Sequence, residues 1–104
     1  MQHNRNEEIL LLDFYGDLLT KHQRDILGEY YNEDFSMNEI ADNYNISKSA
    51  VQDLIKRSLL QLKNYEKVLK LIENNKKLDE IINEMENENN ILLNKYIKKL
   101  NKIK

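Results

Sequence analysis

The sequence contains no cysteine, no proline and no tryptophan, and only two of its 104 residues are glycine. Without cysteine the chain has no disulfide framework, no thiolate nucleophile and no thiolate metal ligand. Without proline it lacks the strongest breaker of helices. A third of the residues are charged. This composition predicts an all-α protein with few sharp loops.

Long apolar runs are also missing. No window approaches the roughly 20 apolar residues that a membrane-spanning helix needs. The first eight residues, MQHNRNEE, lack the apolar centre of a signal peptide. We therefore expect a cytoplasmic protein with no membrane span, and a length of about one domain plus an appendage.

Charge is distributed unevenly along the chain. Residues 1–64 hold seven Lys and Arg against 11 Asp and Glu, whereas residues 65–104 hold nine Lys against seven acidic residues. A protein that binds duplex DNA normally presents a basic face, because neutralising phosphates supplies most of its non-specific affinity. The acidic balance of the N-terminal part therefore weighs against DNA as the partner.

Residues 36–62, SMNEIADNYNISKSAVQDLIKRSLLQL, hold two consecutive helix starts with a short turn between them. Ser36 and Glu39 have the spacing of a capping box, in which each side chain accepts a hydrogen bond from the other residue's backbone amide. Tyr44 closes the last turn of this helix. Asn45 tolerates the left-handed conformation that a short turn needs. The pattern predicts a helix-turn-helix.

The second helix of this motif is expected to begin at Ser47, whose hydroxyl can cap it, after Ile46 has filled the corner. Four apolar residues repeat at the spacing of one buried face: Ala50, Val51, Leu54 and Ile55. In a helix-turn-helix the second helix enters the major groove of DNA. An ordinary helical hairpin with no groove to enter is the alternative. The exposed side is the candidate nucleic-acid or partner face: Lys48, Ser49, Gln52, Asp53, Lys56 and Arg57.

Two helices are predicted before the motif. The first covers Glu7 to Leu19 and has more apolar surface than one side of a small bundle needs, so part of it should pack on the C-terminal segment or on a second subunit. Its apolar stripe contains Leu11, Phe14, Tyr15 and Leu18, widened by Ile9, Leu12 and Leu19. Thr20 and Gln23 form a second capping box, which starts a helix through Tyr31. This helix should supply core residues and end in a loop: Ile26, Leu27, Tyr30 and Tyr31 in the core, residues 32–34 in the loop.

The part of the chain from Leu19 to Arg57 resembles region four of bacterial primary sigma factors. The resemblance is carried by these residues: Leu19, Thr20, Gln23, Arg24, Leu27, Tyr30, Tyr31, Ser36, Glu39, Ile40, Ala41, Ile46, Ser47, Ala50, Val51, Ile55 and Arg57. With LLDFYGDLLT before them and Tyr65 and Glu66 after them, the chain is similar to the YlxM-type proteins over about residues 9–72. That resemblance implies a sigma-like helix-turn-helix bundle with a long C-terminal helical extension. It also implies an accessory or regulatory role in the signal recognition particle pathway.

Residues 65–104 are expected to form that extension, separate from a helix-turn-helix domain at 1–64. Apolar and asparagine residues alternate here in a heptad register, so one continuous coiled-coil helix is one of two possibilities. The first core position would hold Val68, Asn75, Ile82, Asn89, Tyr96 and Ile103, and the second Leu71, Leu78, Met85 and Leu92. In the alternative, residues 74–75 or 87–90 are breaks between shorter helices.

No chemistry-bearing constellation is visible in the sequence. It shows no nucleophile with a base, no phosphate-cradling loop and no ligand cluster. His3 and His22 have no partner at metal-ligand spacing. We expect a non-enzymatic protein without a metal, cofactor or small-molecule substrate.

Two classes of function remain. In the first, the chain binds a protein or RNA component of the signal recognition particle pathway. In the second, it is a sequence-specific DNA-binding transcription regulator, with Lys48, Ser49 and Gln52 near bases and Lys56 and Arg57 on phosphates. The acidic balance and Asp53, which would repel phosphate, favour the first. The surplus apolar surface of the first helix and the heptad pattern predict a homodimer.

Overall fold

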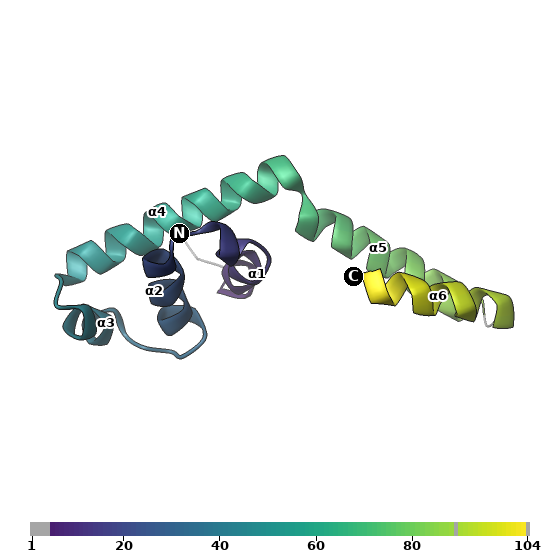
Figure 1. Cartoon of the computed structure of the whole chain (residues 1–104), viewed down its shortest axis with the longest axis horizontal. Helices are drawn as coiled ribbons and strands as arrows, with labels where there is room; N and C mark the ends of the chain where they lie inside the picture. Colours follow the sequence, from purple (N-terminus) through teal and green to yellow (C-terminus); the bar gives the residue numbers. More distant parts are fainter. Residues whose placement is uncertain (1–4, 89, 104) are drawn as a thin grey trace. The chain divides into compact units, whose positions relative to one another are not determined.

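The computed structural model describes residues 5–88 and 90–103, and helices are the only regular secondary structure there (Figure 1). The chain divides into two compact units, Met1–Lys70 and Leu71–Lys104. The division therefore comes six residues later than the predicted boundary after residue 64. The elements, in chain order, are α1 (Arg5–Tyr15), the 3-10 helix η1 (Gly16–Leu18), α2 (Lys21–Tyr31), α3 (Met37–Tyr44), α4 (Lys48–Leu69), α5 (Leu71–Asn87) and α6 (Ile91–Ile103).

The first helix is shorter than predicted. It ends at Tyr15 and is followed by η1, whose last turn closes when the Leu19 amide donates to the Gly16 carbonyl at 3.0 Å. A 3-10 turn has three residues per turn rather than 3.6, so residues after Gly16 leave the helical stripe. Leu18 is consequently 53% exposed, and Phe14 is 36% exposed. The predicted core stripe is confirmed in part: Leu11, Leu12, Tyr15 and Leu19 are buried, and Ile9 is half-buried.

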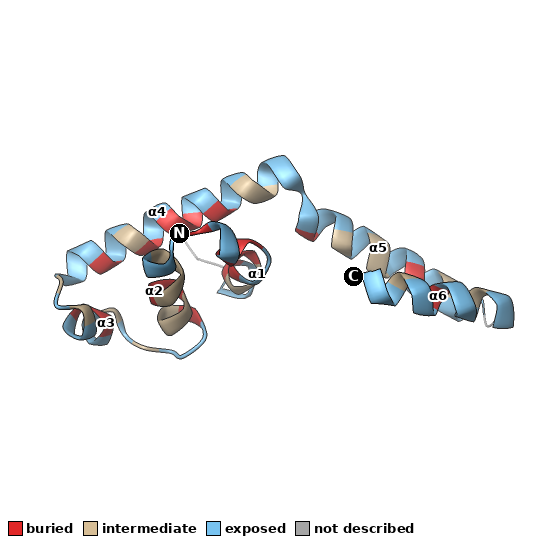
Figure 2. Cartoon of the chain, in the orientation of Figure 1, coloured by how far each residue is buried: buried red, intermediate tan, exposed pale blue. Residues whose placement is uncertain are grey.

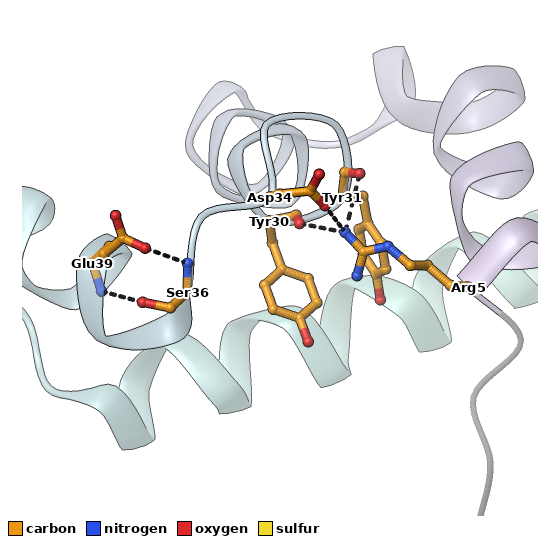
Figure 3. Close-up of polar contacts among 6 residues, drawn as sticks. All are labelled: Arg5, Tyr30, Tyr31, Asp34, Ser36 and Glu39. Carbon is orange, nitrogen blue, oxygen red and sulfur yellow. Dashed lines mark hydrogen bonds and ion pairs between the residues drawn. The ribbon is translucent and has the colours of Figure 1, made fainter.

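Both predicted capping boxes are present. The Gln23 amide donates to the Thr20 hydroxyl at 3.2 Å, and the Thr20 amide donates to the Gln23 side-chain oxygen at 3.0 Å. Ser36 and Glu39 form the same reciprocal pair, with both distances 3.0 Å (Figure 3). Each box satisfies helix N-terminal amides that would otherwise lack partners. The hydrogen bonds from Ser36 hold the pKa of Glu39 below its ordinary value.

The turn between α3 and α4 has the predicted geometry. Asn45 has φ 56° and ψ 44°, in the left-handed region, and its amide donates to carbonyls at the end of α3. Ile46 is half-buried at the corner. The Ser47 hydroxyl then accepts from the Ala50 amide at 3.0 Å and caps α4. These three local signals fix where the two helices begin and end.

Helix α4 is the support on which α1, α2 and α3 pack. Its buried positions recur along one side (Figure 2). They follow the helical repeat: Val51, Ile55, Ser58, Leu59 and Leu62. The prediction was wrong for Ala50, which is exposed, and Leu54 is only half-buried. Ala50 lies one position before Val51, so the helix turns it by about 100° away from the centre of the buried face.

The C-terminal unit is a pair of packed helices and not one continuous coiled-coil helix, which was one of the possibilities left open by the sequence. The alternative break at residues 87–90 is confirmed, because α5 ends at Asn87 and α6 begins at Ile91. The Asn90 side chain accepts from the Leu92 amide at 2.8 Å and caps α6. The other alternative, a break at 74–75, is wrong because both residues lie inside α5. Of the heptad residues, Asn89 lies outside the described part of the chain. Ile82 is buried, whereas Val68, Leu92, Tyr96 and Ile103 are exposed.

Candidate partner-binding site

The candidate face lies on the N-terminal half of α4. All six predicted residues are exposed and lie outside the buried stripe of the helix: Lys48, Ser49, Gln52, Asp53, Lys56 and Arg57. Packing against α1, α2 and α3 holds the buried side and leaves this face to solvent. The role of these residues in binding stays a prediction.

An ion pair changes the electrostatics of this face. The Arg57 Nε lies 3.0 Å from Asp53 Oδ2, one helical turn away, with both side chains more than half exposed. An exposed pair of this kind contributes less than about 1 kcal/mol to stability. It does, however, place the Asp53 carboxylate against the Arg57 guanidinium, which is the cation that would contact a phosphate in a DNA complex. The face therefore presents Lys48 and Lys56 as cations without an ion pair among the described residues.

A groove of about 630 Å³ opens beside this face. It forms where α1, the end of α2 and the start of α3 meet the middle of α4, and Gln52 and Lys56 belong to both the face and the groove. Its other lining residues are Arg5, Glu8, Tyr30, Tyr31, Met37, Ile55, Leu59, Leu60 and Lys63. The volume falls in the range of pockets that bind drug-sized ligands or side chains of a partner.

Arg5 ties the first helix to the end of α2 at one edge of the groove (Figure 3). Its Nη2 donates to the Tyr30 carbonyl at 2.8 Å and the Tyr31 carbonyl at 3.2 Å, and it lies 2.9 Å from Asp34 Oδ1. The guanidinium carbon also lies 5.4 and 5.3 Å from the centroids of the two tyrosine rings. A cation at a helix C-terminus satisfies carbonyls that have no partner within the helix. Arg5 therefore fixes the wall of the groove that the two tyrosines form.

Glu8 and Tyr31 form a buried polar contact at the same wall. Glu8 is 5% exposed, and its carboxylate accepts a hydrogen bond from the Tyr31 hydroxyl at 2.9 Å. Burial, followed by this hydrogen bond, raises the pKa of Tyr31 above its ordinary value. A hydrogen bond from the Tyr44 hydroxyl to Glu29, on the far side of α2, raises the pKa of Tyr44 to about 12. At neutral pH both tyrosines are therefore neutral donors.

The groove was not predicted from the sequence. Arg5 stands in a stretch with no apolar pattern, and its acceptors are 25 to 29 residues away in sequence. Leu60 gave a weak signal, because it is an apolar residue that falls outside the buried stripe of α4. It is 60% exposed. An exposed leucine in a well-defined helix is a position from which a groove or an interface could have been suspected.

Of the two histidines, only His22 lies in the part of the chain that the structure describes. The ring of His22 packs edge-on against Tyr44, with centroids 5.5 Å apart, and His3 lies outside the described residues. In the described ranges, no group of three or more His, Asp or Glu side chains is placed to hold a metal ion. None of the helices found there combines the length and apolarity needed to cross a bilayer.

The fold and the exposed second helix define a small all-α helix-turn-helix protein. The chain belongs to the UPF0122 family, described as "Putative helix-turn-helix protein, YlxM / p13 like", which matches residues 2–103. The description of the family names a helix-turn-helix and no enzymatic activity.

Curated relatives of the same family agree with this assignment. A UPF0122 protein of Clostridium kluyveri is 48% identical over 71 residues, which cover 68% of this chain and 64% of the relative. One from Desulforamulus reducens is 45% identical over 78 residues, covering 71% of this chain and 67% of the relative. One from Clostridium perfringens is 47% identical over 76 residues, covering 73% and 65%. The matching part of the chain thus spans about two thirds of the length of these relatives.

Proposed function

We propose that this protein is a non-enzymatic accessory or regulatory protein that binds a component of the signal recognition particle pathway. The cytoplasmic location that this role requires is part of the proposal. The observation that carries it is the Asp53–Arg57 pair, which offsets an arginine on the face a DNA reader would turn to phosphates. The acidic balance of residues 1–64 supports the same conclusion. The pathway itself is suggested by the resemblance to YlxM-type proteins.

The direct test is binding of the fluorescently labelled full chain to the particle's protein, its RNA and its receptor, each titrated separately. We expect one of the three to bind more tightly than duplex DNA at the same salt concentration. If that partner is the RNA, replacing Lys98, Lys99 and Lys102 by glutamine should weaken binding and reduce its salt dependence, because fewer phosphates are neutralised. Failure of all three components to bind would contradict the proposal.

A second function, sequence-specific DNA binding by a transcription regulator, is favoured by one observation. Lys48, Ser49 and Gln52 lie exposed at the start of α4, where a helix-turn-helix reaches base edges. Glutamine can pair with adenine and lysine with guanine in the major groove. The fold argues for DNA by analogy alone, and the ion pair beside these residues makes this the weaker candidate.

We also propose that the chain forms a homodimer through α5 and α6. These helices bury Ile82 and Ile97, yet large apolar side chains remain exposed on them: Leu71, Ile81, Ile91, Leu92, Tyr96 and Ile103. A unit of 34 residues is below the size at which a single core is usually stable on its own. Helix α5 carries five acidic residues and two lysines, whereas α6 carries four lysines and no acidic residue. A twofold arrangement that sets α5 against the partner's α6 would match these charges.

Light scattering of the full chain at micromolar concentrations tests the dimer. The wild-type protein should have twice the mass of one chain, and a Leu92→Gln, Tyr96→Gln variant should shift toward monomer because it loses apolar area from the interface. Lys76→Gln, an exposed change on α5, is the matched control. A monomeric wild type would rule out the dimer. A double variant that still dimerises would move the contact to Phe14 in α1 and Leu18 in η1.

A further inference from the structure

The groove beside α4 follows the axis of that helix. Six of its lining residues come from α4: Gln52, Ile55, Lys56, Leu59, Leu60 and Lys63. Their spacing of three and four residues places them on one side of the helix over three turns. The eleven steps from Gln52 to Lys63, at 1.5 Å each, give a length of about 16 Å. This is the length of a helical segment of about 12 residues.

The side chains available in the groove are mainly apolar or aromatic. Leu60 is the most exposed of them at 60%, and Met37 and Tyr30 are half-buried. Arg5 and the Glu8 hydrogen bond hold the tyrosine wall in place before any partner arrives. Aromatic and large aliphatic groups on a preorganised wall are the typical anchors of protein interfaces. A partner that covers them gains the free energy of apolar burial.

The charges at the edge of the groove are positive. Lys56 and Lys63 lie seven residues apart on the same side of α4, and neither forms an ion pair among the described residues. Arg5 adds a third cation, partly offset by Asp34. The one acidic lining residue, Glu8, is buried and accepts the Tyr31 hydrogen bond. An acidic occupant therefore meets attraction from two lysines two turns apart.

We propose that this groove binds an acidic amphipathic helix of a partner protein, with its apolar side on Leu59 and Leu60 and its carboxylates at Lys56 and Lys63. The proposal rests on the interaction role proposed above and specifies the kind of protein segment recognised. Insertion of an amphipathic helix into an apolar groove is a recurring mode of peptide recognition. A nucleic-acid strand would use the two lysines but would gain nothing from the leucines, which cannot bond phosphate or base edges.

The test uses the full chain and two labelled peptides of about 12 residues, matched to the length of the groove. Both have leucine at helical spacing, one with glutamate and the other with lysine at the remaining positions. We expect the glutamate peptide to bind at least tenfold more tightly by anisotropy. Lys56→Glu with Lys63→Glu should reverse that preference, whereas Lys21→Glu with Lys76→Glu, which changes the net charge equally outside the groove, should not. Backbone amide NMR shifts on peptide addition should centre on Met37, Leu59 and Leu60.

Three results would overturn the groove assignment. The first is equal binding of the two peptides, and the second is NMR shifts centred outside the groove. The third is a change, with protein concentration, in the NMR shifts of groove residues in the free protein. Such a change would show that a second copy of the chain already occupies the groove. A component of the particle that binds wild type and the Lys56, Lys63 reversal equally would also reject the groove, yet leave the proposed function standing. Peptide binding in the groove without binding of any particle component would reject the function alone.

Discussion

Leu62→Ala should lower the free energy of unfolding by about 2 to 5 kcal/mol, a large part of the total for a chain of this length. Leu62 is fully buried at the end of the α4 stripe that begins at Val51. The substitution loses the favourable free energy of burying the removed carbon atoms. It also leaves a cavity, because the surrounding helices relax only partially. Urea unfolding followed by circular dichroism would measure the change.

Leu60→Ala is the matched control, because Leu60 lies on the same helix but is 60% exposed. Its free energy of unfolding should change by only a few tenths of a kcal/mol. Equal effects of the two substitutions would mean that the buried stripe of α4 has been assigned to the wrong residues.

Tyr31→Phe should destabilise the protein by about 1 to 3 kcal/mol at neutral pH, because it leaves the buried Glu8 carboxylate without one of its hydrogen-bond donors. The pKa of Tyr31 is raised in the folded protein, so folding favours the neutral phenol. This contribution is fully present below the unfolded-state pKa of about 10 and declines as the pH rises above it. The stability difference between wild type and Tyr31→Phe should therefore narrow above pH 10.

Chemical denaturation at a series of pH values from neutral to alkaline would show this trend. Tyr30→Phe is the control, since the half-buried Tyr30 ring packs edge-on against Tyr31, and Tyr31 is the residue whose hydroxyl donates to the Glu8 carboxylate. A difference between wild type and Tyr31→Phe that stays constant through pH 10 to 11 would contradict the assignment of the raised pKa to this buried contact.

Local signals made the helix-turn-helix predictable. Capping boxes at Thr20 and Ser36, the left-handed Asn45 and the cap at Ser47 each depend on residues within four positions of one another. Helix ends set by such contacts can be read from sequence because no distant part of the chain is needed to form them. The exposed face of α4 followed directly, since the buried stripe determines which side remains.

Features assembled from distant segments were not predictable in the same way. The groove needs four helices, and its Arg5 anchor bonds carbonyls 25 and 26 residues away. The end of α1 was missed because apolar residues continue through the 3-10 turn, so the pattern gives no sign of the change in helical period. In the C-terminal unit the heptad pattern was compatible with one helix, whereas the asparagines at 87–90 were compatible with a break between two helices. The side-chain cap at Asn90 favoured two helices over one.

Salt-dependent binding to duplex DNA tests the central claim most directly, namely that the exposed face of α4 recognises a protein or RNA partner of the targeting pathway and not a DNA site. Fluorescence anisotropy of the full chain with labelled duplexes, over a salt series, should show weak binding that is lost near physiological salt. If DNA were the target, Lys56→Ala with Arg57→Ala should flatten the dependence of log affinity on log salt by up to about two units. Sequence-selective nanomolar binding at physiological salt, with no binding to any component of the particle, would contradict this account and identify a transcription regulator.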